Sequence, residues 1–499
     1  AEKICSIAQM LGGDYPEGDL LEMWHGLLSI SPHAIRYSYI RDYDELALKA
    51  EKLKIRAEGL TTSKMKSMAR QVKATRKAAD RIVIFNELSW DRRDLVSAYV
   101  AFPEVGTWRL TVTDNQGRRV PYQITKWVPY GDGSLSEGEI IFLADVPSLG
   151  YSTYFSRLEE KPDEVKPAET PKEIETPFYR IRLRDGGIES LYAKTLEREL
   201  LRAKGVLGND ILFYQAEGMR DFRPGILNGA VEKVKCADTC LIEDGPVRKR
   251  ILVKGNIGDE IKVDRELSVY NELPRIDFLT HIHAPKGDGT LRAQFPLTFE
   301  GKLVAGIPFG AEERDLSREP LMGGERHYGG YEHGFYVMGW LDLMSSDKNY
   351  GVAVLPLVKD LALQGFSLDP KRKVVEHTLL TIMTLPDTGW LSEMSPKIEG
   401  NDPDEFAYSL YPHSGDWGEG EVYRRALEYQ KPLRAFVVTG ENGAPELPDR
   451  QSFLSLNPSN LVLSSLYREG KKLVARFYEQ CGTQCEAEVA LPFLIKKAV

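Results

Sequence analysis

The sequence predicts an α+β protein in which an N-terminal helical bundle is followed by mainly antiparallel β-sandwich domains. Three observations lead to this prediction. Apolar residues near the start recur at the spacing of buried helix faces. From Arg81 onward, short alternating segments are separated by turn residues, as in antiparallel sheets. The chain has 499 residues, of which 42% are apolar and 28% charged, which is typical of a globular protein with several domains.

Residues 1–78 are expected to form the helical bundle. Asp19 has the position of a helix N-cap, and Glu22 follows at the spacing of a capping box. The apolar residues of this segment have the spacing of one buried helix face: Leu20, Leu21, Trp24, Leu27 and Leu28. Further along, Gly59 and the run Thr61–Ser63 predict a break between two long helices.

The rest of the chain is predicted to form two β regions joined by a linker. Residues 79–158 contain short alternating segments, such as Ser97–Phe102, and are expected to form a small β-domain. Residues 159–177 are rich in proline, glutamate and lysine, which fit poorly into a packed sheet, so we expect a linker there. Residues 178–499 return to short strands and turns, and we expect them to form one large β-sandwich.

Both ends of the sequence suggest a piece of a longer chain. The sequence does not begin with Met, and Ile4, Ile7 and Leu11 already have helical spacing from the first turn. The C-terminal end follows closely on the strand-like run Leu491–Ile495. We therefore expect truncation at both ends.

The composition also limits the partners of the chain. Its net charge of −9 argues against nucleic acid, because phosphate binding requires a basic face. No apolar run approaches the ~20 residues of a membrane-spanning helix, so we expect no membrane partner. A neutral substrate fits better, and the 7 Trp and 23 Tyr can supply flat surfaces for sugars. A homo-oligomer is compatible with the sequence, since symmetric assemblies are common.

The cysteines include two pairs with three intervening residues, Cys236 with Cys240 and Cys481 with Cys485. Zinc ribbons prefer two intervening residues, so a zinc site made of these four is disfavoured. Residues i and i+4 of a strand lie about 13 Å apart, too far for a disulfide, although a turn at Gly482–Gln484 would permit one. We expect reduced thiols, as in a cytoplasmic protein.

General catalytic motifs are absent from the sequence. It contains no phosphate-binding loop, dinucleotide fingerprint, HExxH zinc motif or nucleophile elbow. His281 and His283 alternate on one expected strand, as metal ligands can, but no third ligand is evident. Two ordinary strand histidines are the favoured interpretation.

Several segments resemble, in the same order, segments of the family 38 glycoside hydrolases. They are FNELSWDR at 85–92, GPVR at 245–248, PRIDF at 274–278, LRAQFP at 291–296, IPFG at 307–310 followed by Arg314, WLDL at 340–343 followed by YGVAVL at 350–355, and YSLYPHSGDW at 408–417. Each string alone is a weak signal. Their shared order across roughly residues 80–440 is a specific one.

The resemblance implies a zinc-dependent retaining α-mannosidase. Members of the family have a barrel-like N-terminal domain, a helical bundle and a β-sandwich region like the super-sandwich of galactose mutarotase. Their chemistry uses a nucleophile and a general acid/base, two carboxylates about 5–5.5 Å apart. The nucleophile and three of the four zinc ligands lie on the N-terminal domain, which the resemblance places outside this chain. The chain by itself is therefore expected to be inactive.

One zinc ligand is expected within this chain. Residues 27–38 resemble the bundle motif whose histidine binds zinc, and His33 aligns with that histidine. Ala34 stands where the family has an aspartate, and the usual glycine of the motif is also replaced. The resemblance assigns His33 as a metal ligand and no catalytic residue to this chain.

Two further segments carry histidines. The loop Arg326–His333 is rich in glycine, aromatic and hydrogen-bonding residues, as sugar-contacting loops are. His327, Tyr331 and His333 are the candidate substrate-binding residues of this loop. His413 follows an expected strand, and we interpret it as structural.

Two alternatives remain open. The chain could be a non-catalytic carbohydrate-binding or scaffold protein derived from the same family, in which case Ala34 would reflect loss of the site. It could also belong to a different family with mutarotase-like sandwich domains that acts on other sugars. The order of the matching strings disfavours the second alternative.

Overall fold

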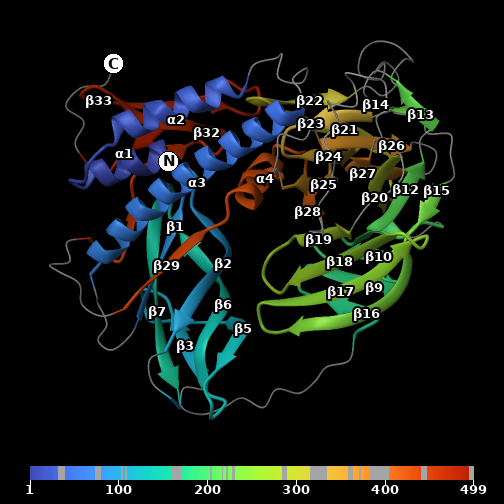
Figure 1. The fold of residues 1–499 in the computed structure, drawn as a ribbon, viewed down its shortest axis with the longest axis horizontal. Coiled ribbons are helices and arrows are strands. Elements are labelled where there is room, and N and C mark those ends of the chain that lie inside the picture. The colour runs from blue at the N-terminus through green and yellow to red at the C-terminus, as the bar shows by residue number, and fades with distance from the viewer. Residues whose placement is uncertain are drawn as a thin grey trace. The chain divides into compact units, whose positions relative to one another are not determined.

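The computed structural model describes most of the chain. The described residues are 1–31, 40–73, 80–102, 105–106, 109–159, 170–202, 205–215, 217–220, 223–226, 231–283, 289–314, 334–357, 364–369, 373–382, 404–439 and 447–493. They form two compact units, the first from residues 1–166 and 431–499 and the second from residues 167–430. Antiparallel sheets dominate both units, so the predicted α+β class is confirmed (Figure 1).

Three helices open the first unit, α1 (Glu2–Met10), α2 (Glu17–Ser29) and α3 (Ile40–Gln71). The expected break at Gly59 is wrong, because α3 runs through it without interruption. The Thr61 hydroxyl donates back to the Ala57 carbonyl within the same helix, so Thr61 is satisfied there. None of the helices in the described parts of the chain is long and apolar enough to cross a membrane.

The predicted start and buried face of α2 also need correction. The helix begins at Glu17 after Pro16, so Asp19 lies inside the first turn instead of capping it. Leu20 and Met23 are buried, in a small cluster with Cys5 of α1. Four large apolar residues expected on the buried face are 44–66% exposed: Leu21, Trp24, Leu27 and Leu28.

The described residues of the first unit form two main sheets and two further pairs of strands. The larger sheet has the order β29-β1-β7-β3-β4, with β30 paired to β7. Its strands are β1 (Asp80–Asn86), β3 (Arg109–Thr113), β4 (Arg119–Val120), β7 (Gly150–Glu159), β29 (Arg434–Val438) and β30 (Arg450–Ser452). The smaller sheet, β2-β6-β5, consists of β2 (Arg92–Ala101), β5 (Tyr122–Pro129) and β6 (Leu135–Val146). The pairs are β31 (Ser455–Asn457) with β34 (Glu488–Ala490), and β32 (Leu461–Glu469) with β33 (Lys472–Glu479).

Strand β1 separates two hydrophobic cores, because alternate side chains point to opposite faces of a sheet. Val83 and Phe85 pack with Ile7 of α1 and Met65 of α3. Residues on the other face of β1 pack against the β2-β6-β5 sheet. The sheet that contains β1 therefore packs against the helices on one face and against the β2-β6-β5 sheet on the other.

The two-unit division differs from the expected domain boundaries. Residues 178–499 were expected to form one sandwich, but residues 431–499 belong to the first unit. The cause is visible in the register, since Ile84 of β1 lies opposite both Ser152 of β7 and Ala435 of β29. A strand from near the end of the chain thus completes the sheet that begins at residue 80.

The second unit is built from three larger sheets and one short pair. A four-stranded sheet, β11-β10-β9-β8, consists of β8 (Glu173–Glu175), β9 (Tyr179–Arg184), β10 (Gly187–Ala193) and β11 (Arg198–Arg202). A six-stranded sheet, β15-β12-β20-β27-β26-β23, consists of β12 (Asp210–Gln215), β15 (Val231–Lys233), β20 (Gly289–Pro296), β23 (Gly334–Val337), β26 (Gln364–Asp369) and β27 (Val374–Ile382). The short pair is β13 (Glu217–Arg220) with β14 (Arg223–Ile226).

The third sheet of this unit has nine strands in the order β16-β17-β18-β19-β28-β25-β24-β21-β22. They are β16 (Lys235–Asp244), β17 (Arg248–Ile257), β18 (Ile261–Tyr270), β19 (Ile276–His283), β21 (Gly301–Ile307), β22 (Gly310–Arg314), β24 (Leu341–Ser345), β25 (Tyr350–Pro356) and β28 (Asp404–Ser414). Helix α4 (Val422–Gln430) follows β28 and contacts β25 (Figure 1).

One continuous hydrophobic core lies between the sheets of the second unit. It joins residues of the nine-stranded sheet, such as Phe278 and Leu343, to residues of the six-stranded sheet, such as Phe295 and Phe366. Facing sheets that share one core form a β-sandwich. The sandwich predicted for this part of the sequence is therefore present, with different boundaries.

Candidate functional site

The residues assigned from the family resemblance fall outside the described parts of the chain. His33 belongs to residues 32–39, and His327, Tyr331 and His333 belong to residues 315–333. Their assignments therefore stay predictions. The described residues offer five further places at which polar or ionisable side chains gather.

The histidines of β19 lie beside single carboxylates. His281 Nδ1 lies 4.0 Å from a carboxylate oxygen of Glu405, and His283 Nε2 lies 3.3 Å from one of Asp264. Within the described ranges, no group of three or more histidine, cysteine, aspartate or glutamate side chains is arranged to hold a metal ion. The five cysteines, all described, form no disulfide with one another.

The six-stranded sheet carries a buried polar cluster centred on Glu376 of β27. Its carboxylate accepts hydrogen bonds from Tyr214 Oη at 2.5 Å and Gln294 Nε2 at 2.5 Å. It also accepts from Arg292 Nη1 at 2.9 Å and Ser367 Oγ at 3.0 Å. A carboxylate has about four acceptor positions, so these four donors occupy them all.

The strand register brings this cluster together. Gln294 of β20 lies opposite Glu376 of β27, which in turn lies opposite Ser367 of β26. The Arg292 guanidinium lies 4.7 Å from the centre of the Tyr214 ring, a cation–π contact. Because the carboxylate is fully hydrogen-bonded, the cluster is suited to holding side chains in place and not to transferring a proton.

This cluster was not predicted from the sequence, although strand β20 carries a signal for it. Thr290, Arg292 and Gln294 alternate with Leu291 and the apolar residues that follow it in β20. Alternation of this kind predicts one polar strand face. Their partner on β27 lies 82 residues further along the chain, at a position that no local pattern indicates.

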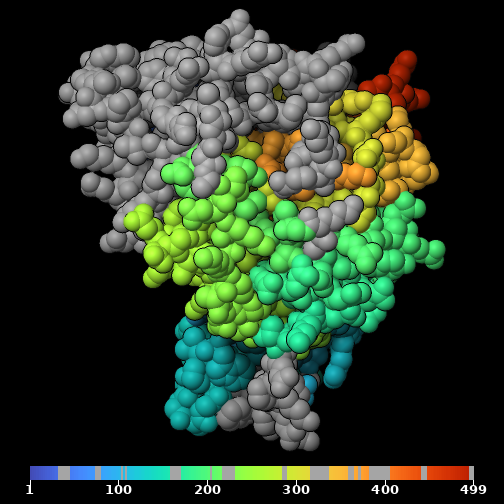
Figure 2. All heavy atoms as spheres, turned by 90° about the vertical axis from the view of Figure 1, so that its right-hand side faces the viewer, coloured from blue at the N-terminus to red at the C-terminus, as the bar shows by residue number. Residues whose placement is uncertain are grey.

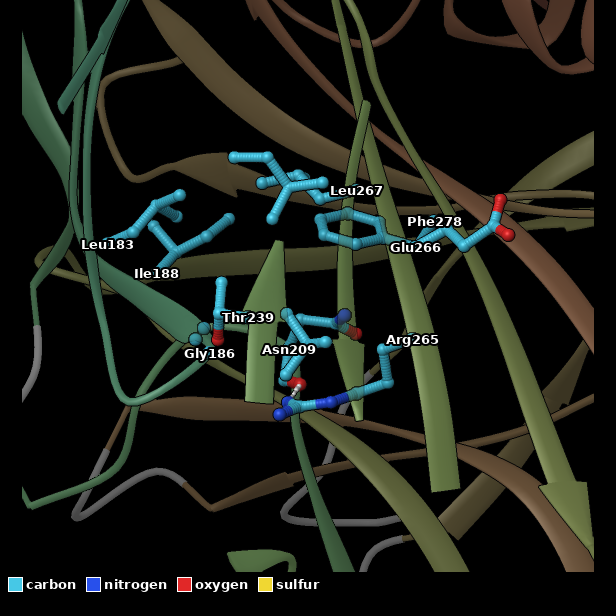
Figure 3. A pocket seen from close by; sticks show the side chains of 13 residues that line it. Leu183, Gly186, Ile188, Asn209, Thr239, Arg265, Glu266, Leu267 and Phe278 are labelled. Carbon is cyan, nitrogen blue, oxygen red and sulfur yellow. Dashed lines mark hydrogen bonds between the residues drawn. The ribbon is translucent and has the colours of Figure 1, made fainter. Parts of the chain in front are cut away.

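A small enclosed cavity lies between the sheets of the second unit, beside Arg265 of β18 (Figure 3). Leu183, Ile188 and Phe278 line its apolar side, and Arg265 reaches toward Asn209 on the other. The volume of the cavity is about 10 Å³. One water molecule needs about 10–15 Å³, so a sugar does not fit.

An ion-pair network covers the surface of β16, β17 and β18 in the second unit, whose residues are yellow-green in Figure 2. Arg248 Nε lies 2.7 Å from Glu243, and Arg250 bridges Glu243 and Glu266. The two signs of charge alternate across these strands. This surface therefore carries paired charges of both signs.

His413, interpreted as structural from the sequence, is buried on β28 with 5% of its surface exposed. Its ring lies 3.0 Å from Asp342 of β24, which is fully buried. This pair lies on the face of the nine-stranded sheet opposite the sandwich core, as Leu341 and Leu410 beside them point into that core.

Comparison with known proteins relates part of this chain to a family of glycosyl hydrolases. Residues 174–388 match the family model "Glycosyl hydrolases family 38 C-terminal domain". The chain is 26% identical over 319 residues to α-mannosidase G of Dictyostelium discoideum, covering 60% of this chain and 26% of that protein. It is 24% identical over 374 residues to α-mannosidase 2C1 of Mus musculus, covering 70% of this chain and 33% of that protein.

Solved structures agree with this match at the level of fold. An α-mannosidase from Enterococcus faecalis V583 superposes with a TM-score of 0.77 at 15% identity, covering 98% of this chain and 61% of that one. A family 38 glycosyl hydrolase from Enterococcus faecalis superposes with a TM-score of 0.77 at 14% identity, covering 98% of this chain and 63% of that one. The chain thus spans about a quarter to a third of the curated relatives and under two thirds of these structures. Residues 174–388 thus match the C-terminal domain of the family 38 glycosyl hydrolases, and the chain has the fold of these two solved structures.

Proposed function

We propose that this chain is the C-terminal part of a zinc-dependent, retaining α-mannosidase that hydrolyses terminal α-mannosides. The observation that carries the proposal is the match of residues 174–388 to the family 38 C-terminal domain. Two curated relatives named as α-mannosidases support the substrate class. Specificity for one α-mannoside over another resides in the residues that line the sugar pocket.

His33 is the residue of this chain proposed to bind the zinc ion. A neutral imidazole is a common zinc ligand, so the donor chemistry fits the metal. The described residues offer no group of three further ligands, so the other ligands are expected from outside them. When bound, zinc would act as a Lewis acid at the sugar hydroxyls.

The exposed apolar surface of α2, which precedes His33 in the sequence, supports an interface with another domain. Leu21, Trp24 and Leu28 are 47–66% exposed and lie at i, i+3 and i+7 of the helix. They therefore form one apolar stripe, which ends five residues before His33. Such a stripe is suited to packing against another folded domain, and the matched relatives are longer than this chain.

The loop at 326–333 is proposed to contact the sugar. His327, Tyr331 and His333 combine hydrogen-bonding groups with an aromatic ring, which suits the hydroxyl and C–H faces of a pyranose. The loop belongs to the β-sandwich part of the sequence, between β22 and β23.

An activity assay tests this function. The complete gene product is expected to cleave an aryl α-mannoside when supplied with zinc, and to lose activity with a chelator. The 499-residue chain by itself is expected to be inactive, because the nucleophile and the general acid/base are proposed to lie outside it. Turnover by the 499-residue chain alone would overturn this assignment of the carboxylates, and an inactive, folded, zinc-loaded complete product would overturn the proposed function.

A non-catalytic carbohydrate-binding or scaffold protein is the second candidate. The observation that favours it is Ala34, which replaces the aspartate of the family motif directly after His33. In that case the complete product binds α-mannosides without hydrolysing them. Equilibrium binding of mannose by a protein without turnover would select this candidate over the first.

A further inference from the structure

His413 is held between two hydrogen-bond acceptors. Its Nε2 lies 3.0 Å from Asp342 Oδ1, and its Nδ1 lies 3.3 Å from the carbonyl oxygen of Ser414. The side chain of His413 is 1% exposed and that of Asp342 is fully buried, so water does not reach the pair. The protonation state of the imidazole therefore depends on the two oxygens that its ring nitrogens face.

A carbonyl oxygen and a carboxylate oxygen only accept hydrogen bonds. A neutral imidazole has a single N–H, so one of its nitrogens would direct a lone pair at an oxygen. An imidazolium has two N–H groups and can donate to both oxygens at once. The geometry therefore fits a positively charged His413 beside a negatively charged Asp342.

Two glycines beside the His413–Asp342 pair leave the space that its side chains occupy. Strand β25 lies between β24 and β28 in the sheet, so the His413–Asp342 contact crosses over it at Gly351. A Cβ atom at Gly351 would lie 2.6 Å from Nε2 of His413 and 2.8 Å from Oδ1 of Asp342. On the other side, a Cβ atom at Gly420 would overlap the imidazole ring. Glycine at both positions leaves the space that the pair fills.

The pair connects the sheet to the segment that follows it, residues 415–430, which comprises a loop and helix α4. Tyr411 stacks on His413 with ring centres 5.8 Å apart, and its hydroxyl donates to the Gly420 carbonyl at 3.1 Å. In the same segment, Trp417 stacks on Trp340 at 5.4 Å. These contacts place the loop and α4 over the outer face of the nine-stranded sheet.

Charged groups around His413 come from several elements. Asp342 of β24 is the nearest, and Asp416 of the loop adds a second negative charge. On its own strand the neighbour is Tyr411, which in turn lies near Arg425, Glu421 and Glu428 at the α4 end. Burial lowers the pKa of His413, but the two aspartates outweigh it, so the pKa lies above the usual 6.5.

We propose that His413 and Asp342 form a buried ion pair that fastens residues 415–430 to the sheet, and that loss of the proton from His413 loosens this segment. Because the proton is bound more tightly in the folded state, the stabilisation is complete below the unfolded pKa, near 6.5, and is lost as pH rises through the higher folded pKa. The segment thus responds to alkaline pH while the sandwich core does not.

Two measurements test the proposal. The ring ¹⁵N signals of His413, assigned with a His413→Gln variant, are expected to show both nitrogens protonated at pH 7. Hydrogen exchange, corrected for its intrinsic pH dependence, is expected to accelerate at least tenfold in residues 415–430 between pH 7 and pH 9.5. The exchange of the sandwich core, such as β20, is expected to stay unchanged.

Matched variants distinguish the effect of the His413–Asp342 pair on hydrogen exchange from general effects of pH. In His413→Gln, exchange of residues 415–430 is expected to be faster at both pH values without the pH-dependent step. His283→Gln, which removes a part-exposed histidine of β19, is expected to behave like the wild type. A neutral His413 ring at pH 7, or a pH response shared equally by residues 415–430 and the core, would overturn the proposal. Hydrogen exchange of the wild type, compared between residues 415–430 and the core at the two pH values, decides the question even if a variant fails to fold.

Discussion

Arg265 donates a hydrogen bond from Nη1 to the backbone carbonyl of Asn209 at 2.5 Å, across the interior of the second unit (Figure 3). Arg265 belongs to β18 of the nine-stranded sheet, and Asn209 precedes β12 of the six-stranded sheet. The bond therefore links the two layers of the sandwich through a guanidinium that is almost fully buried. Asp210 is 4.0 Å from the same guanidinium and also pairs with Lys233 at 2.6 Å.

Replacing Arg265 is expected to show how much this hydrogen bond contributes to the free energy of unfolding. Arg265→Ala removes the bond and leaves a cavity, so we expect a loss of about 3 kcal/mol in the free energy of unfolding. Arg265→Met keeps most of the volume, and Asp210 keeps its pairing with Lys233, so we expect a loss under about 2 kcal/mol. Urea denaturation of both variants measures the difference. An equal loss in the two would contradict the importance of volume at this position.

Two glycines are expected to respond oppositely to alanine. Gly351→Ala places a methyl group against the buried pair of His413 and Asp342, so we expect destabilisation by about 1–3 kcal/mol. In helix α3, a Cβ built at Gly59 meets no described atom within 4 Å apart from its chain neighbours and the nearby backbone of the helix itself. Gly59→Ala is therefore expected to stabilise the protein by up to about 1 kcal/mol. Thermal unfolding of the two variants against the wild type checks both signs.

The same glycine shows what a local sequence pattern can miss. Gly59 was expected to end a helix, yet α3 continues through it because Met65 and Met68 of the following turns are anchored in a core. The exposed stripe on α2 was expected to be buried, because periodicity indicates an apolar face but not what covers it. The helices and the antiparallel strands were predictable, because the apolar spacing of a helix and the alternation of a strand appear within a short stretch of sequence.

Long-range pairing is the part of the fold that the sequence did not indicate. Strand β29 pairs with β1 across about 350 residues, and that pairing moves residues 431–499 into the first unit. The buried cluster around Glu376 was missed for the same reason. Its polar residues on β20 alternate visibly, but Glu376 and Tyr214 come from distant strands that only the fold brings together.

The Glu376 cluster is expected to be sensitive to loss of its central acceptor. Glu376→Ala removes the carboxylate to which Tyr214, Gln294 and Arg292 donate in a buried site. We therefore expect a loss of about 3 kcal/mol or more in the free energy of unfolding. Glu300→Ala, a matched control, removes an exposed carboxylate paired with Lys373 and should leave the free energy of unfolding nearly unchanged. Similar losses in the two variants would show that the cluster contributes little.

His377 is expected to give the protein a sensitivity to acid. It stacks on Phe366 at 4.5 Å inside the sandwich, and burial lowers its pKa from 6.5 to about 3. The unfolded chain therefore binds a proton between these values that the folded chain does not. The stability from this group is present above about pH 6.5 and falls with decreasing pH, by at most about 1.4 kcal/mol per pH unit.

A His377→Gln variant tests this expectation, because glutamine does not titrate. Urea denaturation at pH 7, 6 and 5 is expected to show a shallower loss of stability in the variant than in the wild type. His281→Gln, which removes a partly exposed histidine from β19, is expected to keep the wild-type slope. Identical slopes in the wild type and His377→Gln would mean that His377 is not held neutral.

The measurement that tests the central claim most directly is the zinc affinity of the complete gene product with and without His33. One zinc ion per chain is expected in the wild type and in His25→Ala, a control that removes an exposed histidine of α2. His33→Ala is expected to weaken zinc binding by at least tenfold, because a directly coordinating imidazole is lost. Equal zinc affinity in all three proteins would contradict the claim that this chain contributes to the metal site of an α-mannosidase.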